Sequence, residues 1–238
     1  MIDVKLRRSR KEDARSLFPE GGGSMTHTSI SIIRQEHRAL SAMLRSITLL
    51  LGEHHRRGSV PDFDALRAML FYVDEFPEKL HHPKETRLLF PKLRGLDAQV
   101  DSVLDRLDHD HACGENAVRE LEHALVAFEM MAETDQREAR REVFETAVQK
   151  YVAFYLEHMR VEEAVVLPLA ESALCAADWA ELDAAFLANR DPLAGHEADE
   201  PYRPLFRKIL RLLPGSNSIG SALEALAGTA VPKYRWPP

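Results

Sequence analysis

The chain has 238 residues, 45% of them hydrophobic and 29% charged, which suffices for one sizeable core, or a domain with an extension, without disulfides. Its formal net charge of -7 disfavours general binding to nucleic acid or anionic membranes, because such partners attract basic surfaces. The two cysteines, Cys113 and Cys175, form no CxxC motif, so neither a disulfide framework nor a thiolate zinc site is indicated. The sequence also lacks an apolar run of about 18 residues and the apolar core of a signal peptide, so we expect a cytoplasmic protein without a membrane span.

Four segments of the chain have the periodicity of amphipathic helices. Before them, residues 1–24 end in EGGGS, a composition that predicts a flexible leader directly before Met25. In each segment apolar residues recur every three or four positions, as on one buried face of a helix. The chain is also rich in Ala, Leu, Glu and Arg, which favour helix. The segments cover residues 28–51, 63–88, 100–128 and 144–169, and their inward histidines are His37, His81, His111 and His158.

The connections between these segments are short, which makes neighbouring helices antiparallel. We therefore predict an all-α fold, an up-down-up-down four-helix bundle over residues 25–175 with a helical C-terminal extension and tail over residues 176–238. A weak internal repeat supports this pairing, because HHPKETRLLFP in the second segment resembles HMRVEEAVVLP in the fourth. In both, a glutamate follows a histidine by four positions.

Three of the inward histidines have a glutamate four positions later, on the same helix face. The first segment offers only His37, since Ser41 occupies the matching position. Burying three carboxylates without compensation would cost several kcal/mol for each charge, and a pair of cations removes that cost. Imidazole and carboxylate ligands without thiolate suit iron better than manganese or zinc. The predicted metal ligands are His37, His81, Glu85, His111, Glu115, His158 and Glu162.

Over roughly residues 28–170 these motifs resemble the bacterial haemerythrin-like, or HHE cation-binding, proteins. The resemblance implies a bundle that holds two iron ions joined by an oxo or hydroxo bridge. Glu115 stands where oxygen-carrying members have a histidine, and an anionic ligand there would favour ferric iron and argue against reversible oxygen carriage. The resemblance implies that one iron is held by His37 and His81 and the other by His111 and His158, with Glu85 and Glu162 bridging.

The short side chain of Ser41 predicts that the iron of His37 and His81 has fewer protein donors and an open position. We expect dioxygen, nitric oxide or peroxide to bind there, because their chemistry needs a redox-active metal with a vacant site. A sensing, scavenging or stress role follows from that interpretation. Two alternatives stay open: a peroxide-consuming enzyme of catalase or peroxidase type at the same site, and a metal-stabilised interaction or iron-storage protein whose extension contacts a partner or completes a homodimer.

The second segment contains two prolines, Pro77 and Pro83, which remove backbone hydrogen bonds and predict a kink, or a break at His82. His82 is about a third of a turn away from His81, so we expect it outside the ligand set or at the surface. Other neighbours of the ligands could orient an imidazole or serve only in packing or at the surface: Glu36, Asp110, Glu163, Tyr151 and Tyr155.

Overall fold

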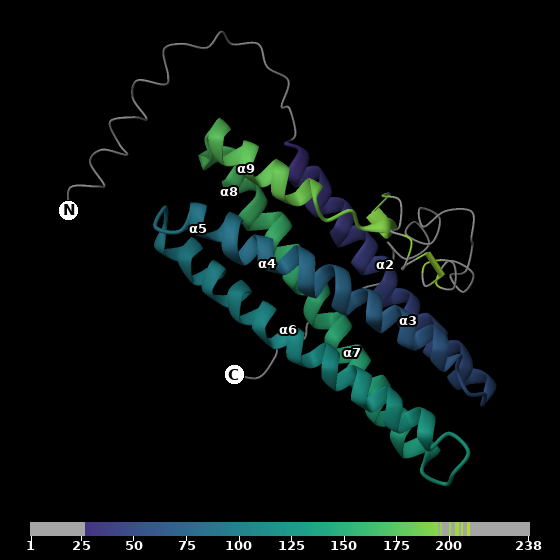
Figure 1. Cartoon of the computed structure of the whole chain (residues 1–238). Helices are drawn as coiled ribbons and strands as arrows, with labels where there is room; N and C mark the ends of the chain where they lie inside the picture. Colours follow the sequence, from purple (N-terminus) through teal and green to yellow (C-terminus); the bar gives the residue numbers. More distant parts are fainter. Residues whose placement is uncertain are drawn as a thin grey trace, which may run out of the picture.

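The computed structural model describes residues 27–194, 196, 200, 203, 204, 206 and 209, and within this part all regular structure is helical. Four long helical rods lie side by side, which confirms the predicted all-α bundle (Figure 1). The predicted leader, residues 1–24, and most of the chain after residue 194 lie outside the described residues. The rods are α2 (Thr28–Arg57); α3 (Phe63–Val73) with η2 (Asp74–His81), α4 (His82–Lys84), η3 (Glu85–Leu89) and α5 (Phe90–Leu93); α6 (Ala98–Met130); and α7 (Arg137–Val161) with η4 (Glu162–Val166) and α8 (Leu167–Ala173).

The rods begin and end at residues that suit a helix terminus. The Asp62 side chain caps α3 by accepting a hydrogen bond from the Ala65 N–H at 2.9 Å. Asp97 caps α6 in the same way, accepting from the Gln99 N–H at 2.7 Å. Gly58 ends α2 with a φ of 62°, a left-handed conformation that glycine adopts without strain.

The second rod remains helical through both prolines because it widens into π-helical turns. In η2 the His82 N–H bonds to the Pro77 carbonyl, five residues back, and in η3 the Phe90 N–H bonds to that of Glu85. Pro83 lies in the first turn of the short α4, where its missing N–H costs little. The irregularity predicted at the prolines therefore takes the form of π turns, and the rod does not break at His82.

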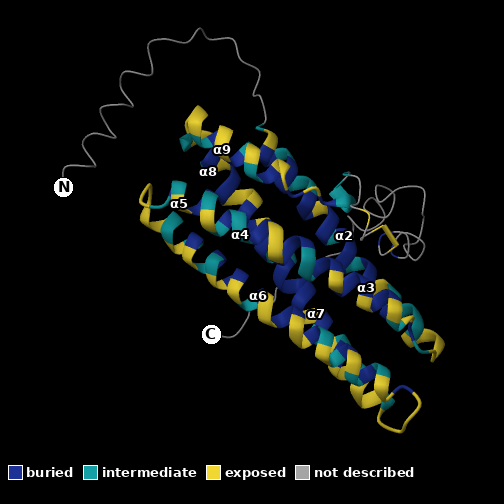
Figure 2. Ribbon diagram, in the orientation of Figure 1, coloured by how far each residue is buried: buried dark blue, intermediate teal, exposed yellow. Residues whose placement is uncertain are grey.

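The apolar core has two parts, and the predicted ligands lie between them. One hydrophobic cluster includes Leu40 on α2 and Ala117 on α6, while the other includes Ile33 and Leu107 on the same two rods. His37 therefore lies between the two clusters along α2, and the ligands of the other rods are arranged in the same way. Buried residues fill the space between the rods, and exposed ones face outward (Figure 2). The fold thus supports a polar layer with apolar packing above and below it.

One further helix, α9 (Ala176–Leu187), packs against α2 and begins the predicted extension. It buries Trp179, Leu182 and Phe186 against one part of the core. The Ser29 N–H and hydroxyl both donate to Asp183 of α9 at 2.7 Å. A short 3-10 turn, η5 (Pro192–Ala194), follows and also contacts α2.

None of the described helices is long and apolar enough to cross a membrane.

Candidate metal centre

Four buried histidines, one from each rod, meet in the polar layer as two pairs. The Nε2 atoms of His37 and His81 are 3.2 Å apart, and those of His111 and His158 are 3.0 Å apart. All four side chains are at most 8% exposed. The structure therefore groups the imidazoles in the same pairs that the family resemblance implied.

Two buried glutamates connect the pairs. Glu85 places Oε1 3.2 Å from His81 Nε2 and Oε2 3.6 Å from His111 Nε2. Glu162 places Oε2 3.3 Å from His37 Nε2 and Oε1 3.2 Å from His158 Nε2. Each carboxylate thus directs one oxygen to each imidazole pair, which is the arrangement of a bridging ligand.

The four oxygens of Glu85 and Glu162 are buried and have no hydrogen-bond partner among the described residues. Burial of a carboxylate that accepts no hydrogen bond costs several kcal/mol, so native structures almost always compensate it. Cations between the carboxylates and the imidazole Nε2 atoms would supply that compensation. Imidazole nitrogen and carboxylate oxygen are both established ligands of first-row transition metals. The residues present therefore fit a metal centre.

The outward nitrogen of each imidazole is also occupied, which fixes the ring's orientation. His37 Nδ1 lies 3.0 Å from Glu163 Oε1 and His81 Nδ1 lies 2.7 Å from Glu36 Oε2. A carboxylate can only accept here, so Nδ1 carries the proton and Nε2 presents its lone pair to the interior. His158 and His111 have the corresponding Nδ1 contacts with Asp110 at 3.4 Å and with the Thr86 hydroxyl at 2.8 Å.

Three of these oxygens, on Glu36, Asp110 and Glu163, belong to residues that the sequence had suggested as orienting groups. Thr86 was not predicted, and nothing in its sequence position distinguishes it from any other helical threonine. Its role becomes visible only when the second and third rods are packed together.

Burial by itself lowers the pKa of these imidazoles, and neighbouring carboxylates decide the outcome. Glu162 raises the pKa of His158 to about 10 in spite of burial. Glu85 raises the pKa of His81 well above its usual value in the same way. For His111, burial and the neighbouring imidazoles leave the pKa well below its usual value. The carboxylates thus favour protonated imidazoles, and metal ions bound at these nitrogens would compete with those protons.

The prediction that Glu115 is a ligand is wrong. Its side chain is 56% exposed and forms an ion pair with Arg119 on the outer face of α6. Gly114, not Glu115, faces the interior at this level. A Cβ on Gly114 would lie 1.6 Å from the Tyr155 hydroxyl oxygen, so the phenol fills the interior space beside Gly114.

Of the two positions expected for His82, outside the ligand set or at the surface, the structure excludes the surface. Its side chain is 3% exposed, and donor atoms of His82, His111 and His158 lie within 4.8 Å of one another. A regular helix would turn His82 away from the side of His81, but η2 has the wider turns of a π-helix, with more residues in each turn. In the sequence, the tandem histidines and the two nearby prolines were the features that could have indicated this inward position of His82.

Ser41 follows His37 by one turn on α2. Its hydroxyl lies 3.9 Å from the sulfur of Met159. The close groups of ligand atoms are His37, His81 and Glu85 on one side, and Glu85, His111, His158 and Glu162 on the other.

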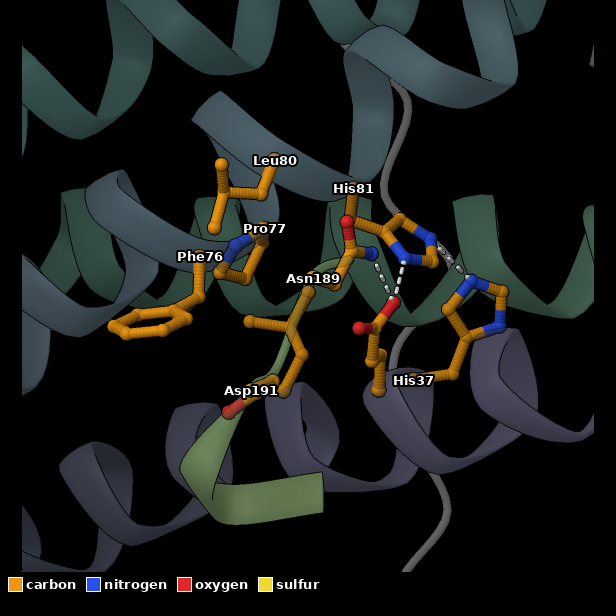
Figure 3. Close-up of a pocket in the computed structure, with 9 residues that line it drawn as sticks. His37, Phe76, Pro77, Leu80, His81, Asn189 and Asp191 are labelled. Atoms are coloured by element: carbon orange, nitrogen blue, oxygen red, sulfur yellow. Dashed lines mark hydrogen bonds and ion pairs between the residues drawn. The ribbon is translucent and has the colours of Figure 1, made fainter. Parts of the chain in front are cut away.

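A small cavity adjoins the His37 and His81 pair (Figure 3). Its volume is about 10 Å³, room for one water-sized molecule. Leu40, Phe76 and Leu80 give it an apolar wall. The cavity therefore borders the half of the cluster that contains His37 and His81.

The fold and this cluster together define a class of protein: a helical bundle that binds metal through imidazoles and carboxylates in its interior. The family model for the Hemerythrin HHE cation binding domain matches residues 28–170, more than half of the chain. The chain belongs to this family, whose members typically hold a di-iron centre. No curated protein and no solved structure matches the chain.

Proposed function

We propose that the protein is a non-haem di-iron protein that binds dioxygen, nitric oxide or peroxide in a sensing or stress role. The observation that carries the proposal is the pair of buried carboxylates, Glu85 and Glu162, whose unpartnered oxygens each point to a different imidazole pair. His37 and His81 would hold one iron, and the other imidazole pair would hold the second. Iron supplies the redox chemistry that these small ligands require.

The ligand atoms of the cluster favour iron over metal ions that prefer thiolate ligands or oxygen ligands alone. All donors in the cluster are imidazole nitrogens or carboxylate oxygens, a mixture that suits iron better than calcium or magnesium. The cysteines lie outside the cluster: Cys113 contacts His109, and Cys175 lies at the start of α9. Cys113 and Cys175 are not joined by a disulfide bond, which suits a reducing compartment such as the cytoplasm.

The protein's own residues decide where a small ligand would bind. The cavity adjoins the side with His37 and His81, so we assign the open position to this side. The apolar wall of the cavity favours an uncharged diatomic molecule or peroxide over a larger or charged one. Glu163 and Glu36 hold the two imidazoles in place from outside through Nδ1.

The test is metal analysis followed by anaerobic optical spectroscopy on the reduced protein. We expect about two iron ions per chain and absorption bands that change on separate addition of dioxygen, nitric oxide and peroxide. Less than about one iron per chain, or bands that respond to none of the three, would contradict the proposal. Peroxide consumption that disappears in Glu85→Ala and His111→Ala would extend it to the enzymatic alternative.

A further inference from the structure

His82 lies inside the metal centre, although its position in the sequence suggested otherwise. Its ring stacks on that of His111, with centroids 4.5 Å apart and an interplanar angle of 15°. The His82 ring is also parallel to that of Tyr155, with centroids 5.2 Å apart and an interplanar angle of 1°. The ring of His158 is 5.7 Å away. His82 thus has the burial and the neighbours of a residue that faces the His111 and His158 pair.

The Nδ1 atom of His82 is engaged in the same manner as those of the four paired histidines. It lies 3.1 Å from Glu78 Oε2, which leaves Nε2 as the atom available to a metal ion. Glu78 is held in turn by Tyr151 and Tyr155, whose hydroxyls both donate to Oε1 at 2.7 Å. This buried carboxylate therefore has a defined place and a defined partner for each oxygen.

We propose that His82 is the third imidazole ligand of the metal ion held by His111 and His158, an inference that rests on the proposed metal centre. Glu78 is then a positioning residue, and Tyr151 and Tyr155 hold it. A histidine of the second rod takes the ligand place that the sequence had assigned to Glu115 on the third.

Two local features of the chain make this exchange of ligands sterically consistent. The π-helical η2 ends at His81, so the wider turn brings both His81 and His82 inward. Gly114 leaves room on α6 for the Tyr155 phenol, which supports the His82 ring and its carboxylate partner. Pro83 starts the next turn without needing a hydrogen-bond acceptor.

With His82 as a ligand, the two metal ions would differ in their number of imidazole ligands. One would have three imidazoles, and the other would keep two imidazoles beside the cavity. An extra protein ligand on the enclosed side fills a position that a small molecule would otherwise occupy, so ligand binding is directed to the side of His37 and His81.

Proton NMR of the wild-type protein loaded with cobalt(II) counts the imidazoles directly. Each metal-bound ring with a protonated Nδ1 gives one strongly shifted, solvent-exchangeable N–H signal. We expect five such signals, from His37, His81, His82, His111 and His158, because all five have an oxygen at Nδ1. Two bound cobalt ions with only four signals would overturn the inference and leave the proposed metal centre intact. A protein that binds no cobalt or iron would overturn both.

Variants provide a second readout that does not depend on ligand turnover. We expect His82→Ala to weaken the binding of one of the two ions by about 100-fold, and added imidazole to restore it. Glu78→Gln is expected to weaken the same ion by about 10-fold, because the orienting carboxylate is lost. Glu115→Ala is the matched control and should bind both ions as the wild type does. Unchanged affinity for both ions in a folded His82→Ala would contradict the assignment, and the wild-type NMR count decides if that variant does not fold.

Discussion

The two halves of the metal centre differ in what surrounds their imidazoles. His111 and His158 are enclosed by aromatic rings, since Phe90 and His82 stack on His111 and Tyr155 contacts His158 edge-on. The opposite half, with His37 and His81, instead adjoins the small cavity beside α2 (Figure 3). An enclosed half is suited to retaining a metal ion, and a half that borders a cavity is suited to receiving a ligand.

The half beside the cavity also depends on the segment after α9, which lies outside the matched domain. Asn189 donates from Nδ2 to Glu36 Oε2 at 2.9 Å, and that same oxygen orients His81. Asp191 accepts a hydrogen bond from the Tyr72 hydroxyl at 2.7 Å. Both side chains line the cavity (Figure 3). Residues beyond the matched range 28–170 thus close the side of the cluster that contains His37 and His81.

Removal of a shared bridge should affect both halves and have the largest effect. We expect Glu85→Ala to lose both iron ions, with affinity reduced by at least about 100-fold, because its oxygens face both imidazole pairs. Metal analysis after dialysis measures this loss. Glu157→Ala, on the outer face of α7, is the control, and an unchanged iron content in Glu85→Ala would refute the bridging role.

Removal of one imidazole should separate the halves. His37→Ala is expected to lose the ion beside the cavity, and with it the response to nitric oxide, while the His111 and His158 ion remains at about one per chain. Quantitative iron analysis with nitric oxide titration checks both parts. His54→Ala, near the end of the same helix, should behave as the wild type. Retention of the nitric oxide response in His37→Ala would mean that the open position is not on the half with His37 and His81, which would contradict this account.

The segment that closes the cavity should respond to pH. Burial raises the pKa of Asp191 to about 6, although hydrogen bonds from Tyr72 and the Leu193 N–H oppose the shift. A raised carboxyl pKa favours folding most below the unfolded value of 3.8, and this contribution is lost as the pH rises through about 6. Asp191→Asn keeps the neutral form, so it should be more stable than the wild type by up to about 3 kcal/mol at pH 7.5 and by only about 1 kcal/mol at pH 4.5.

Urea unfolding of chelator-treated protein at the two pH values measures this difference. The comparison with wild type cancels the titration of the metal ligands, which both proteins share. Asp135→Asn, in an exposed turn, should show no such dependence. A stability difference for Asp191→Asn that does not change with pH would show that the carboxyl is not the group responsible.

A smaller effect is expected from removal of the Asn189 amide, in the same segment as Asp191. Asn189→Ala removes the hydrogen bond to Glu36, so His81 is less firmly oriented, and affinity for the ion beside the cavity should fall by about 10-fold. The enclosed ion should be unaffected. Competitive titration with a chelator resolves the two ions, with the exposed Asn116→Ala as control. Equal weakening of both ions would mean that the segment stabilises the fold as a whole and not this half.

The smallest effect is expected at Glu115, which was wrongly predicted from the sequence to be a metal ligand. Glu115→Ala should retain both ions and lose at most about 0.5 kcal/mol of stability, since its exposed ion pair with Arg119 is within one helix. Metal analysis and thermal unfolding measure the two quantities. A loss of iron in this variant would restore Glu115 to the ligand set.

The rods and most of the inward residues could be predicted because amphipathic periodicity is a local property of the sequence. His37, His111 and His158 lie on regular helices, and the structure brings them together as the spacing required. Glu115 and His82 could not be placed in this way. The first depends on which side chain from a neighbouring rod fills the space beside Gly114, and the second depends on a π turn that changes the helical pitch.

Crystallography with anomalous scattering at the iron edge tests the central claim most directly. We predict two iron peaks between the rods, one beside the Nε2 atoms of His37 and His81 and the other beside those of His111 and His158, with Glu85 and Glu162 between them. A crystal of the iron-loaded protein with no peak in this layer, or with a single peak at the surface, would contradict the account.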